Sequence, residues 1–230
     1  MARKKAAVRR EEILAATVEE IESSGLRALR VSDVAARLGL SASLVIYHFE
    51  TKEALVSAAF HFAGRQDIEH ARELAAGTAV SGDGGGDAAS ARTEAPRDGG
   101  EDVTSGTASA RGEQSALKQL REVVGWYLPS GSSRSWKIWI DAWSAGLFDA
   151  ELRSTYAALD QEWKSILAGL MDEAIVAGEC SVPEGGTEEC ATRVLAFLDG
   201  LAIQVMVNSE AVDTEALSTW VDDFLTRELG

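Results

Sequence analysis

The chain has 230 residues, a formal net charge of −15 and two cysteines. Two cysteines in a chain of this length exclude a disulfide framework, and three prolines with few alternating β-branched runs favour an all-α fold. No apolar run approaches the roughly 18 residues that span a bilayer, and no apolar signal segment follows the basic N-terminus. We therefore expect a cytoplasmic protein with free thiols and no membrane partner.

The positive charges are concentrated near the start of the chain. Residues 1–60 hold nine Lys or Arg and eight Asp or Glu, a balance of +1, whereas the remainder carries −16. Binding to a polyanion depends on where the cations lie and not on the total charge. This asymmetry is typical of a two-part protein with a near-neutral end and an acidic body.

The first predicted helix covers residues 9–24, where apolar side chains recur every three or four residues, and Gly25 ends it. A second, short helix is predicted around residues 32–38, with one apolar face formed by Val31, Val34, Ala35 and Leu38. Gly39 follows as a left-handed stop, because a residue without Cβ adopts that backbone without strain.

A third helix is predicted after this turn, with Ser41 or Ser43 as its N-cap. Its core face is expected to hold Leu44, Val45 and Phe49. The opposite face carries Ala42, Ser43, Ile46, Tyr47 and His48. Two apolar-faced helices joined by a short glycine-containing turn form a helix-turn-helix, whose second helix enters the major groove of double-stranded DNA.

The rest of the chain is predicted to be helical apart from one segment. Thr51 caps a helix that continues to about Ala75. Residues 77–112 hold nine glycines and no aromatic residue, so they bury too little apolar surface to offset chain entropy and are expected to form a disordered or mobile insertion. Further helices are predicted over 114–128, 133–147, 150–177, 187–209 and 214–229, which brings the total to about nine.

Residues 9–62 resemble the TetR family of bacterial transcription regulators. The resemblance rests on the turn Gly39-Leu40-Ser41, on the run Ile46-Tyr47-His48-Phe49 and on the following Lys52-Glu53-Ala54-Leu55. Segments 136–143 and 198–202 are similar to the BetI-type subgroup. The resemblance implies a DNA-binding domain over 1–53 and a regulatory and dimerisation domain over 54–230. The insertion at 77–112 departs from the family, which normally has a short loop there.

The third helix has few side chains suited to reading bases. Its base-facing candidates are Ala42, Ser43 and Ile46, of which Ser43 hydrogen-bonds base edges and the other two suit a thymine methyl group. The resemblance implies phosphate contacts from Ser32, Tyr47, His48 and Lys52. An alternative places the Tyr47 ring in the small core. Residues Arg3, Lys4 and Lys5 form either a DNA-contacting arm or a solubilising tail.

All six tryptophans lie at or after position 126. Most are expected to pack in the core, but Trp and Tyr also carry polar groups and are abundant here for a core alone. A pocket between helices is the expected site of a small-molecule effector, with Tyr127, Trp139, Trp143 and Trp163 as candidate lining residues. Asp141 or Asp160 is expected to face a cationic group, which would make a cation–π site.

The last two predicted helices each carry an apolar stripe, suited either to the subunit core or to a partner helix. The resemblance implies that they pair across a homodimer, with interface candidates Phe197, Leu201, Val205, Trp220 and Phe224. A twofold dimer would place two recognition helices about 34–36 Å apart, which suits a palindromic operator.

The leading hypothesis is therefore a ligand-responsive homodimeric repressor. The alternative is a ligand-independent regulator, repressor or activator, with a fully packed C-terminal bundle. No nucleophile–base pair, metal-ligand cluster or phosphate loop is visible in the sequence, so we expect neither an enzyme nor a metal or cofactor site.

Overall fold

The computed structural model describes residues 6–78, 115–129, 134–208, 210, 212–213 and 215–230. These residues form nine α-helices and no strand, which confirms the predicted all-α class. Most of the predicted insertion, residues 79–112, and the basic residues Arg3, Lys4 and Lys5 lie outside the described residues. The helices are α1 (Ala6–Ser24), α2 (Val31–Arg37), α3 (Ala42–Phe49), α4 (Lys52–Ala75), α5 (Ala116–Tyr127), α6 (Arg134–Gly146), α7 (Ala150–Val176), α8 (Thr187–Val207) and α9 (Leu217–Leu229).

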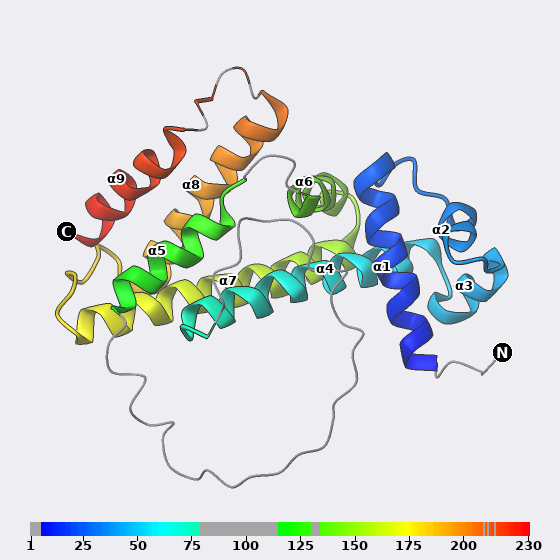
Figure 1. The fold of residues 1–230 in the computed structure, drawn as a ribbon, viewed down its shortest axis with the longest axis horizontal. Helices are drawn as coiled ribbons and strands as arrows, with labels where there is room; N and C mark the ends of the chain where they lie inside the picture. Colours follow the sequence, from blue (N-terminus) through cyan, green and yellow to red (C-terminus); the bar gives the residue numbers. More distant parts are fainter. Residues whose placement is uncertain (1–5, 79–114, 130–133, 209, 211, 214) are drawn as a thin grey trace, which may run out of the picture.

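The helices are arranged in two parts that α4 connects (Figure 1). Helices α1, α2 and α3 lie together at the N-terminal end. The long helices α4 and α7 run side by side through the middle, and α5, α8 and α9 cover the other end of α7. Helix α6 packs on α7 and also contacts α1, so it lies at the junction of the two parts. The predicted domain boundary at 53/54 falls in the first turn of α4, which the two parts therefore share.

Local sequence signals set the ends of several helices as predicted. Gly25 and Gly39 have φ of +79° and +63°, the left-handed conformation that glycine adopts without strain. The Ser41 hydroxyl accepts the backbone N–H of Leu44 at 3.3 Å, and the Thr51 hydroxyl accepts that of Ala54 at 3.0 Å. Both are N-caps, which satisfy a backbone donor left free at the start of a helix.

Helix α4 is held closely to α7. A Cβ on Gly64 would lie 2.5 Å from a methyl group of Leu159, which is fully buried, so glycine allows the close approach of the two helices. The guanidinium groups of Arg65 and Arg72 both bind the carboxylate of Glu162, the latter at 2.7 Å. Burial works against ionisation of Glu162, but these two hydrogen bonds prevail and lower its pKa.

Helix α8 is long and apolar enough to cross a membrane, judged by length and composition alone. This finding differs from the expectation that no segment would approach that length. The composition of α8 also suits a core helix, because Val194, Leu198 and Ala202 are buried and α8 packs against α7.

Candidate DNA-binding and ligand-binding sites

Helix α3 divides into a buried and an exposed face. Val45 and Phe49 are buried in the small N-terminal core, as predicted. Leu44 was predicted to share that core, but its side chain is 37 % exposed. The prediction for Leu44 was wrong because α3 has only eight residues, and Val45 and Phe49, four residues apart, suffice to cover the narrow core.

The exposed face of α3 carries the predicted DNA contacts. Tyr47 is 79 % exposed, which contradicts the alternative that its ring packs in the core. Ala42 and Ser43 are exposed, Ile46 and His48 are half-buried, and the Ser43 hydroxyl lies 2.9 Å from that of Ser41. Ser32 at the start of α2 is exposed, and Lys52 in the first turn of α4 is half-buried. The structure therefore brings the predicted residues to α3 and the helix starts beside it.

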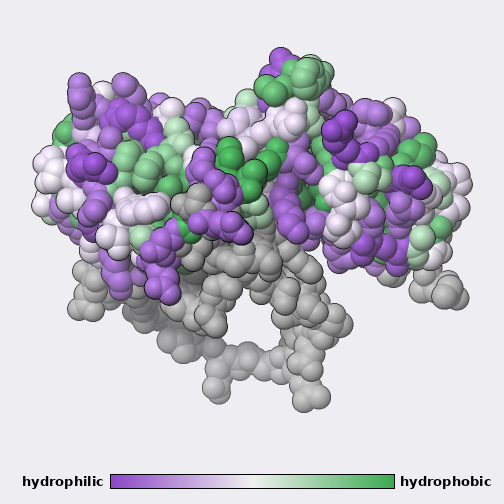
Figure 2. Space-filling model, turned by 90° about the horizontal axis from the view of Figure 1, so that it is seen from above, coloured by the Kyte–Doolittle hydropathy of each residue, from purple (hydrophilic) through white to green (hydrophobic). Residues whose placement is uncertain are grey.

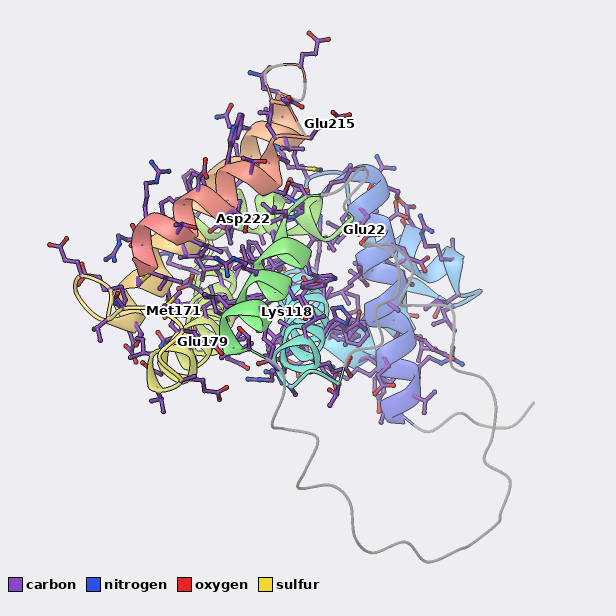
Figure 3. The ribbon with its side chains drawn as sticks, turned by 60° about the vertical axis from the view of Figure 1, so that its left-hand side comes forward. Glu22, Lys118, Met171, Glu179, Glu215 and Asp222 are labelled. Carbon is purple, nitrogen blue, oxygen red and sulfur yellow. The ribbon has the colours of Figure 1, made fainter. Side chains whose placement is uncertain are left out.

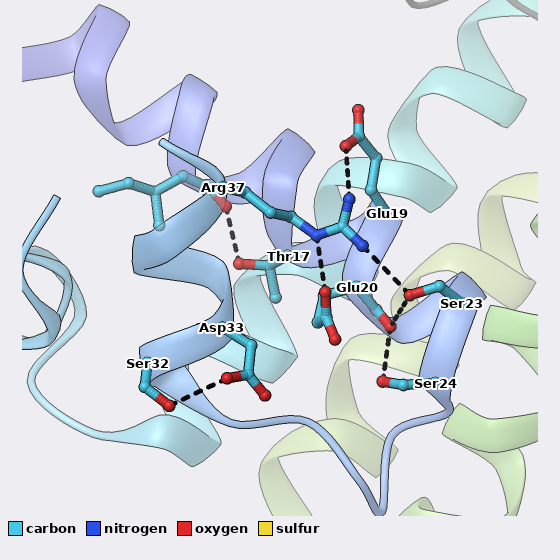
Figure 4. A network of polar contacts seen from close by, with 9 residues as sticks. Thr17, Glu19, Glu20, Ser23, Ser24, Ser32, Asp33 and Arg37 are labelled. Carbon is cyan, nitrogen blue, oxygen red and sulfur yellow. Dashed lines mark hydrogen bonds and ion pairs between the residues drawn. The ribbon is translucent and has the colours of Figure 1, made fainter. Parts of the chain in front are cut away.

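Two further arginines were missed by the sequence reasoning. Arg27 and Arg30 are exposed in the link between α1 and α2 and form no ion pair with any residue that the structure describes. By contrast, Arg37 at the end of α2 binds Glu20 at 2.6 Å, Glu19 at 3.4 Å and the Ser23 hydroxyl at 3.3 Å (Figure 4). Arg37 is therefore neutralised and fastens α2 to α1, whereas Arg27 and Arg30 remain free to attract phosphates.

Helix α3 is also fixed at its C-terminal end. The Arg10 guanidinium donates to the carbonyl of His48 at 2.6 Å and lies 4.0 Å from the centre of the Phe49 ring. A cation at the C-terminus of a helix also interacts favourably with the helix dipole. Glu50, at the joint between α3 and α4, has φ of +67°, a conformation that non-glycine residues adopt at a cost of about 1–3 kcal/mol. Arg10 and this joint hold the orientation of α3 against α1 and α4.

Six aromatic side chains from α5, α6 and α7 form one connected group, here called the aromatic cluster: Tyr127, Trp136, Trp139, Trp143, Tyr156 and Trp163. The Tyr127 ring lies edge-on to Trp136 and Trp163, with 5.0 and 4.8 Å between ring centroids. Trp143 lies 6.1 Å from Trp136 and 6.2 Å from Tyr156. All four predicted ligand residues thus lie in one cluster, to which the structure adds Trp136 and Tyr156.

Asp199 on α8 gives the aromatic cluster a polar centre. It accepts the Tyr127 hydroxyl at 2.8 Å, while Asp160 pairs with Lys164 at 2.7 Å and accepts the Tyr156 hydroxyl at 3.5 Å. Burial raises the pKa of the Asp199 carboxyl to about 6. The hydrogen bond from Tyr127 opposes this rise, and the charge of Asp160 adds to it. Lys164 balances one of the two carboxylates Asp160 and Asp199, so among these three groups ionised Asp199 leaves one negative charge in excess.

Two indole N–H groups in the aromatic cluster have no acceptor. The Nε1 atoms of Trp143 and Trp163 are buried and have no hydrogen-bond partner among the described residues. The other two indoles are paired: Nε1 of Trp139 donates to Asp67 at 2.9 Å, and Nε1 of Trp136 donates to the backbone carbonyl of Tyr127 at 3.2 Å. A buried donor without an acceptor costs about 1–3 kcal/mol, which a ligand oxygen would recover.

Asp141 does not join the aromatic cluster as a cation partner. Its Oδ2 accepts the backbone N–H of Leu26 at 2.8 Å, in the link after α1. The expectation for Asp141 therefore needs correction, whereas Asp160 lies beside Tyr156 of the cluster and stays a candidate. The carboxylate at the centre, Asp199, was missed because nothing in the local sequence of α8 indicates its partner Tyr127, 72 residues away.

The outer side of α8 and α9 carries apolar side chains. Figure 2 shows hydrophobic surface on the side of the molecule where these helices lie in Figure 1. The rings of Phe197 and Phe224 stack at 4.2 Å, both half-buried, and Trp220 is 41 % exposed. Leu201 is half-buried, but Val205 is buried within the subunit. Elsewhere on α8, the apolar side chains of Ile203 and Val207 are exposed.

The helix-turn-helix with its exposed recognition helix, joined to a helical domain with an aromatic cluster, defines a DNA-binding transcription regulator. Residues 13–59 match the family model described as bacterial regulatory proteins of the tetR family, and residues 116–230 match the BetI-type transcriptional repressor C-terminal model. The chain belongs to the TetR family of transcription regulators, with a BetI-type C-terminal domain.

Individual relatives agree with this assignment. The HTH-type transcriptional regulator BetI of Stenotrophomonas maltophilia is 25 % identical over 196 residues, which cover 84 % of this chain and 79 % of the relative. A putative regulator from Saccharomonospora viridis, solved in complex with choline, is 20 % identical with a TM-score of 0.70, covering 97 % of this chain and 98 % of that one. A TetR regulator from Haloarcula marismortui is 14 % identical with a TM-score of 0.73, covering 97 % and 100 %.

Proposed function

We propose that this regulator is a homodimeric repressor that binds a palindromic operator and responds to an organic ammonium cation. The aromatic cluster around Asp199 is the observation that carries the proposal. A cation placed there would be attracted by the faces of several aromatic rings, at about 2 kcal/mol or more where water is excluded. It would also neutralise the negative charge that Lys164 leaves unbalanced.

The two indole N–H groups without an acceptor restrict the chemical class of the ligand further. A cation that also carries an oxygen would offer an acceptor to the buried N–H of Trp143 or Trp163. Choline, the ligand of the Saccharomonospora viridis regulator, has both a quaternary ammonium and a hydroxyl group. An ammonium alcohol of this kind is therefore the effector that the side chains of the cluster favour.

Charge, rather than shape, should decide ligand binding. We expect choline chloride to bind in isothermal titration calorimetry and 3,3-dimethyl-1-butanol, its neutral isostere, to bind at least about tenfold more weakly, because the alcohol loses the cation–π and charge attraction. The exposed Phe148, which lies outside the aromatic cluster, offers a control, and Phe148→Leu should leave the choline affinity unchanged. Equal binding of choline and the neutral alcohol would contradict an ammonium site.

For DNA, we propose that Ala42, Ser43 and Ile46 face bases. The proposed phosphate contacts are Ser32, Tyr47, His48 and Lys52, joined by the free cations Arg27 and Arg30. The exposure of Ala42, Ser43 and Tyr47 on α3 and of Ser32 near the start of α2 supports this division. Few of these side chains make bidentate contacts with bases, so phosphate contacts and DNA shape should supply much of the affinity.

Replacing Tyr47 and Lys52 together by Ala should weaken binding to all duplexes and lower the slope of affinity against salt by about one, because one cationic phosphate contact is lost. Gel-shift titrations at several salt concentrations measure both quantities. The control is Lys118→Ala, which removes a cation on α5 that is 67 % exposed and far from α3 in the fold. Unaltered affinity of the double variant would show that these residues do not contact DNA.

We further propose that α8 and α9 form the dimer interface, with Phe197, Leu201, Trp220 and Phe224 at its apolar centre. Ile203 and Val207 are further exposed apolar side chains of α8, which adds apolar surface to this helix. Val205, which is buried within the subunit, would pack beneath the interface and not contact the partner. The proposed functional division remains at residues 1–53 and 54–230, with α4 as the shared element.

A further inference from the structure

We propose that Asp141 is the positioning residue through which the aromatic cluster acts on the DNA-binding helices. The inference rests on the ligand site proposed above. Asp141 lies on α6, the helix that supplies three tryptophans of the cluster, and its carboxylate holds the backbone N–H of Leu26 just beyond α1. A shift of α6 on ligand binding would therefore be passed to the end of α1 and to the link that leads into α2.

The contact joins parts of the chain that are 115 residues apart. Asp141 Oδ2 lies 2.8 Å from the Leu26 nitrogen, and a Cβ on the preceding residue, Gly25, would lie 3.5 Å from the same oxygen. Gly25 has φ of +79°, so the chain turns sharply where the carboxylate reaches it. The bond is thus made at the turn that sets the angle between α1 and the helix-turn-helix.

Helix α6 presents Asp141 and the tryptophans on different faces. Successive residues of a helix are about 100° apart, so Trp139 and Trp143, each two positions away, lie about 160° from Asp141. Trp143 belongs to the side of the cluster next to Tyr156, whereas Asp141 and Ala142 line a small apolar cavity together with Ile21 and Leu26. Asp141 therefore lies on the side of α6 that faces α1 and the link to α2.

The alternative is that ligand binding acts on the DNA-binding helices through α4, but α4 is held firmly against α7. Arg65 and Arg72 bind Glu162 on α7, and Gly64 packs closely on Leu159. A tilt of α4 against α7 would have to break these contacts, whereas the bond of Asp141 to the Leu26 N–H carries a movement of α6 directly to the end of α1. The structure therefore favours α6 as the connection from ligand to DNA.

The test compares three variants. Asp141→Ala removes the acceptor of the Leu26 N–H, and Asp141→Asn keeps an acceptor oxygen in nearly the same place. Glu179→Ala is the matched control, because Glu179 likewise accepts a backbone N–H, that of Leu117, at 2.8 Å, but within the regulatory part (Figure 3). Glu179→Ala should lower the thermal stability as Asp141→Ala does, but it leaves the contact between α6 and α1 intact.

The first readout is the ratio of DNA affinities with and without choline chloride, on a duplex selected from a random pool with the wild-type protein. Allosteric ratios are commonly about 5- to 150-fold. We expect Asp141→Ala to bring the ratio within about twofold of unity, and Asp141→Asn and Glu179→Ala to keep most of the wild-type ratio. The inference would be overturned if Asp141→Ala kept the wild-type ratio of DNA affinities, or if Glu179→Ala lost as much of that ratio as Asp141→Ala.

The second readout needs no effector. All six tryptophans lie at or after position 126, so selectively excited tryptophan fluorescence reports on the regulatory part alone. Coupling is reciprocal, so the selected duplex should change this fluorescence in the wild type, in Asp141→Asn and in Glu179→Ala but not in Asp141→Ala. If choline fails to bind, the proposed ligand class is wrong. The inference on Asp141 is then decided by this fluorescence change, and a change retained in Asp141→Ala would refute it.

Discussion

Asp199→Asn should abolish most of the affinity for an ammonium cation while making the folded protein more stable at neutral pH. The amide keeps an acceptor for the Tyr127 hydroxyl but removes the charge that the cation would neutralise. We expect choline affinity to fall about 10- to 100-fold, equivalent to about 1.4–2.8 kcal/mol. Calorimetric titration measures this loss, and undiminished affinity would remove Asp199 from the ligand site.

The stability gain follows from the raised pKa of Asp199. Burial moves this pKa from 3.8 to about 6, so the folded state binds the proton more tightly than the unfolded state. Ionised Asp199 therefore lowers the free energy of unfolding by at most about 3 kcal/mol above pH 6, and this penalty fades as the pH falls from 6 towards 4. Thermal melts of Asp199→Asn should exceed those of the wild type by several degrees at pH 7.5 and converge near pH 4.

Choline affinity of the wild type should show the matching pH dependence. The cation prefers ionised Asp199, so affinity should be constant above about pH 7 and fall through pH 6 to 5 as the carboxyl becomes protonated. In Asp199→Asn the residual affinity should lack this step.

Gly200→Glu should convert the proposed dimer into a monomer with an intact fold. Gly200 is exposed on α8, and no atom lies within 4 Å of the position that a Cβ would take there, so the subunit accommodates the new side chain. Replacing a mid-helix glycine also favours the helix by about 0.5–1 kcal/mol. At a twofold interface, however, two carboxylates would be buried close together. Light scattering coupled to size-exclusion chromatography measures the change.

The matched control is Gly169→Glu on α7, another exposed helical glycine at which a Cβ would have no atom within 4 Å. It should remain dimeric. Monomeric Gly200→Glu should also lose about a hundredfold or more in operator affinity, because a single recognition helix cannot use both half-sites. A dimeric Gly200→Glu would place the interface away from this part of α8.

Helix ends were predictable because their causes are local. The cap at Thr51 acts over three residues, and the left-handed turn at Gly39 depends on that residue alone. The apolar spacing of Val45 and Phe49 likewise identified the buried face of α3, although it did not exclude Leu44. Such signals lie within one or two turns of a helix, so a single sequence contains them in full.

Contacts between distant helices were not predictable in the same way. The sequence indicated that tryptophans would gather and that a carboxylate would face them, but it suggested Asp141 or Asp160. Which carboxylate reaches the centre depends on the packing angle of α8 against α5, which places Asp199 beside Tyr127. The packing of α6 against α1 and α7 places Asp141 beside Leu26 instead. Helical periodicity fixes the face of a residue but not the neighbour that this face meets.

The division of α3 into two faces bears on how such a regulator acquires new target genes. Val45 and Phe49 hold the helix in the fold, while Ala42, Ser43 and Ile46 contribute little to the core. Exposed substitutions usually change stability by less than about 0.5 kcal/mol. With these three side chains facing bases, as proposed, new operator sequences would be reachable by mutation without loss of folding or of the response to the effector, so DNA preference and ligand preference would be free to evolve separately.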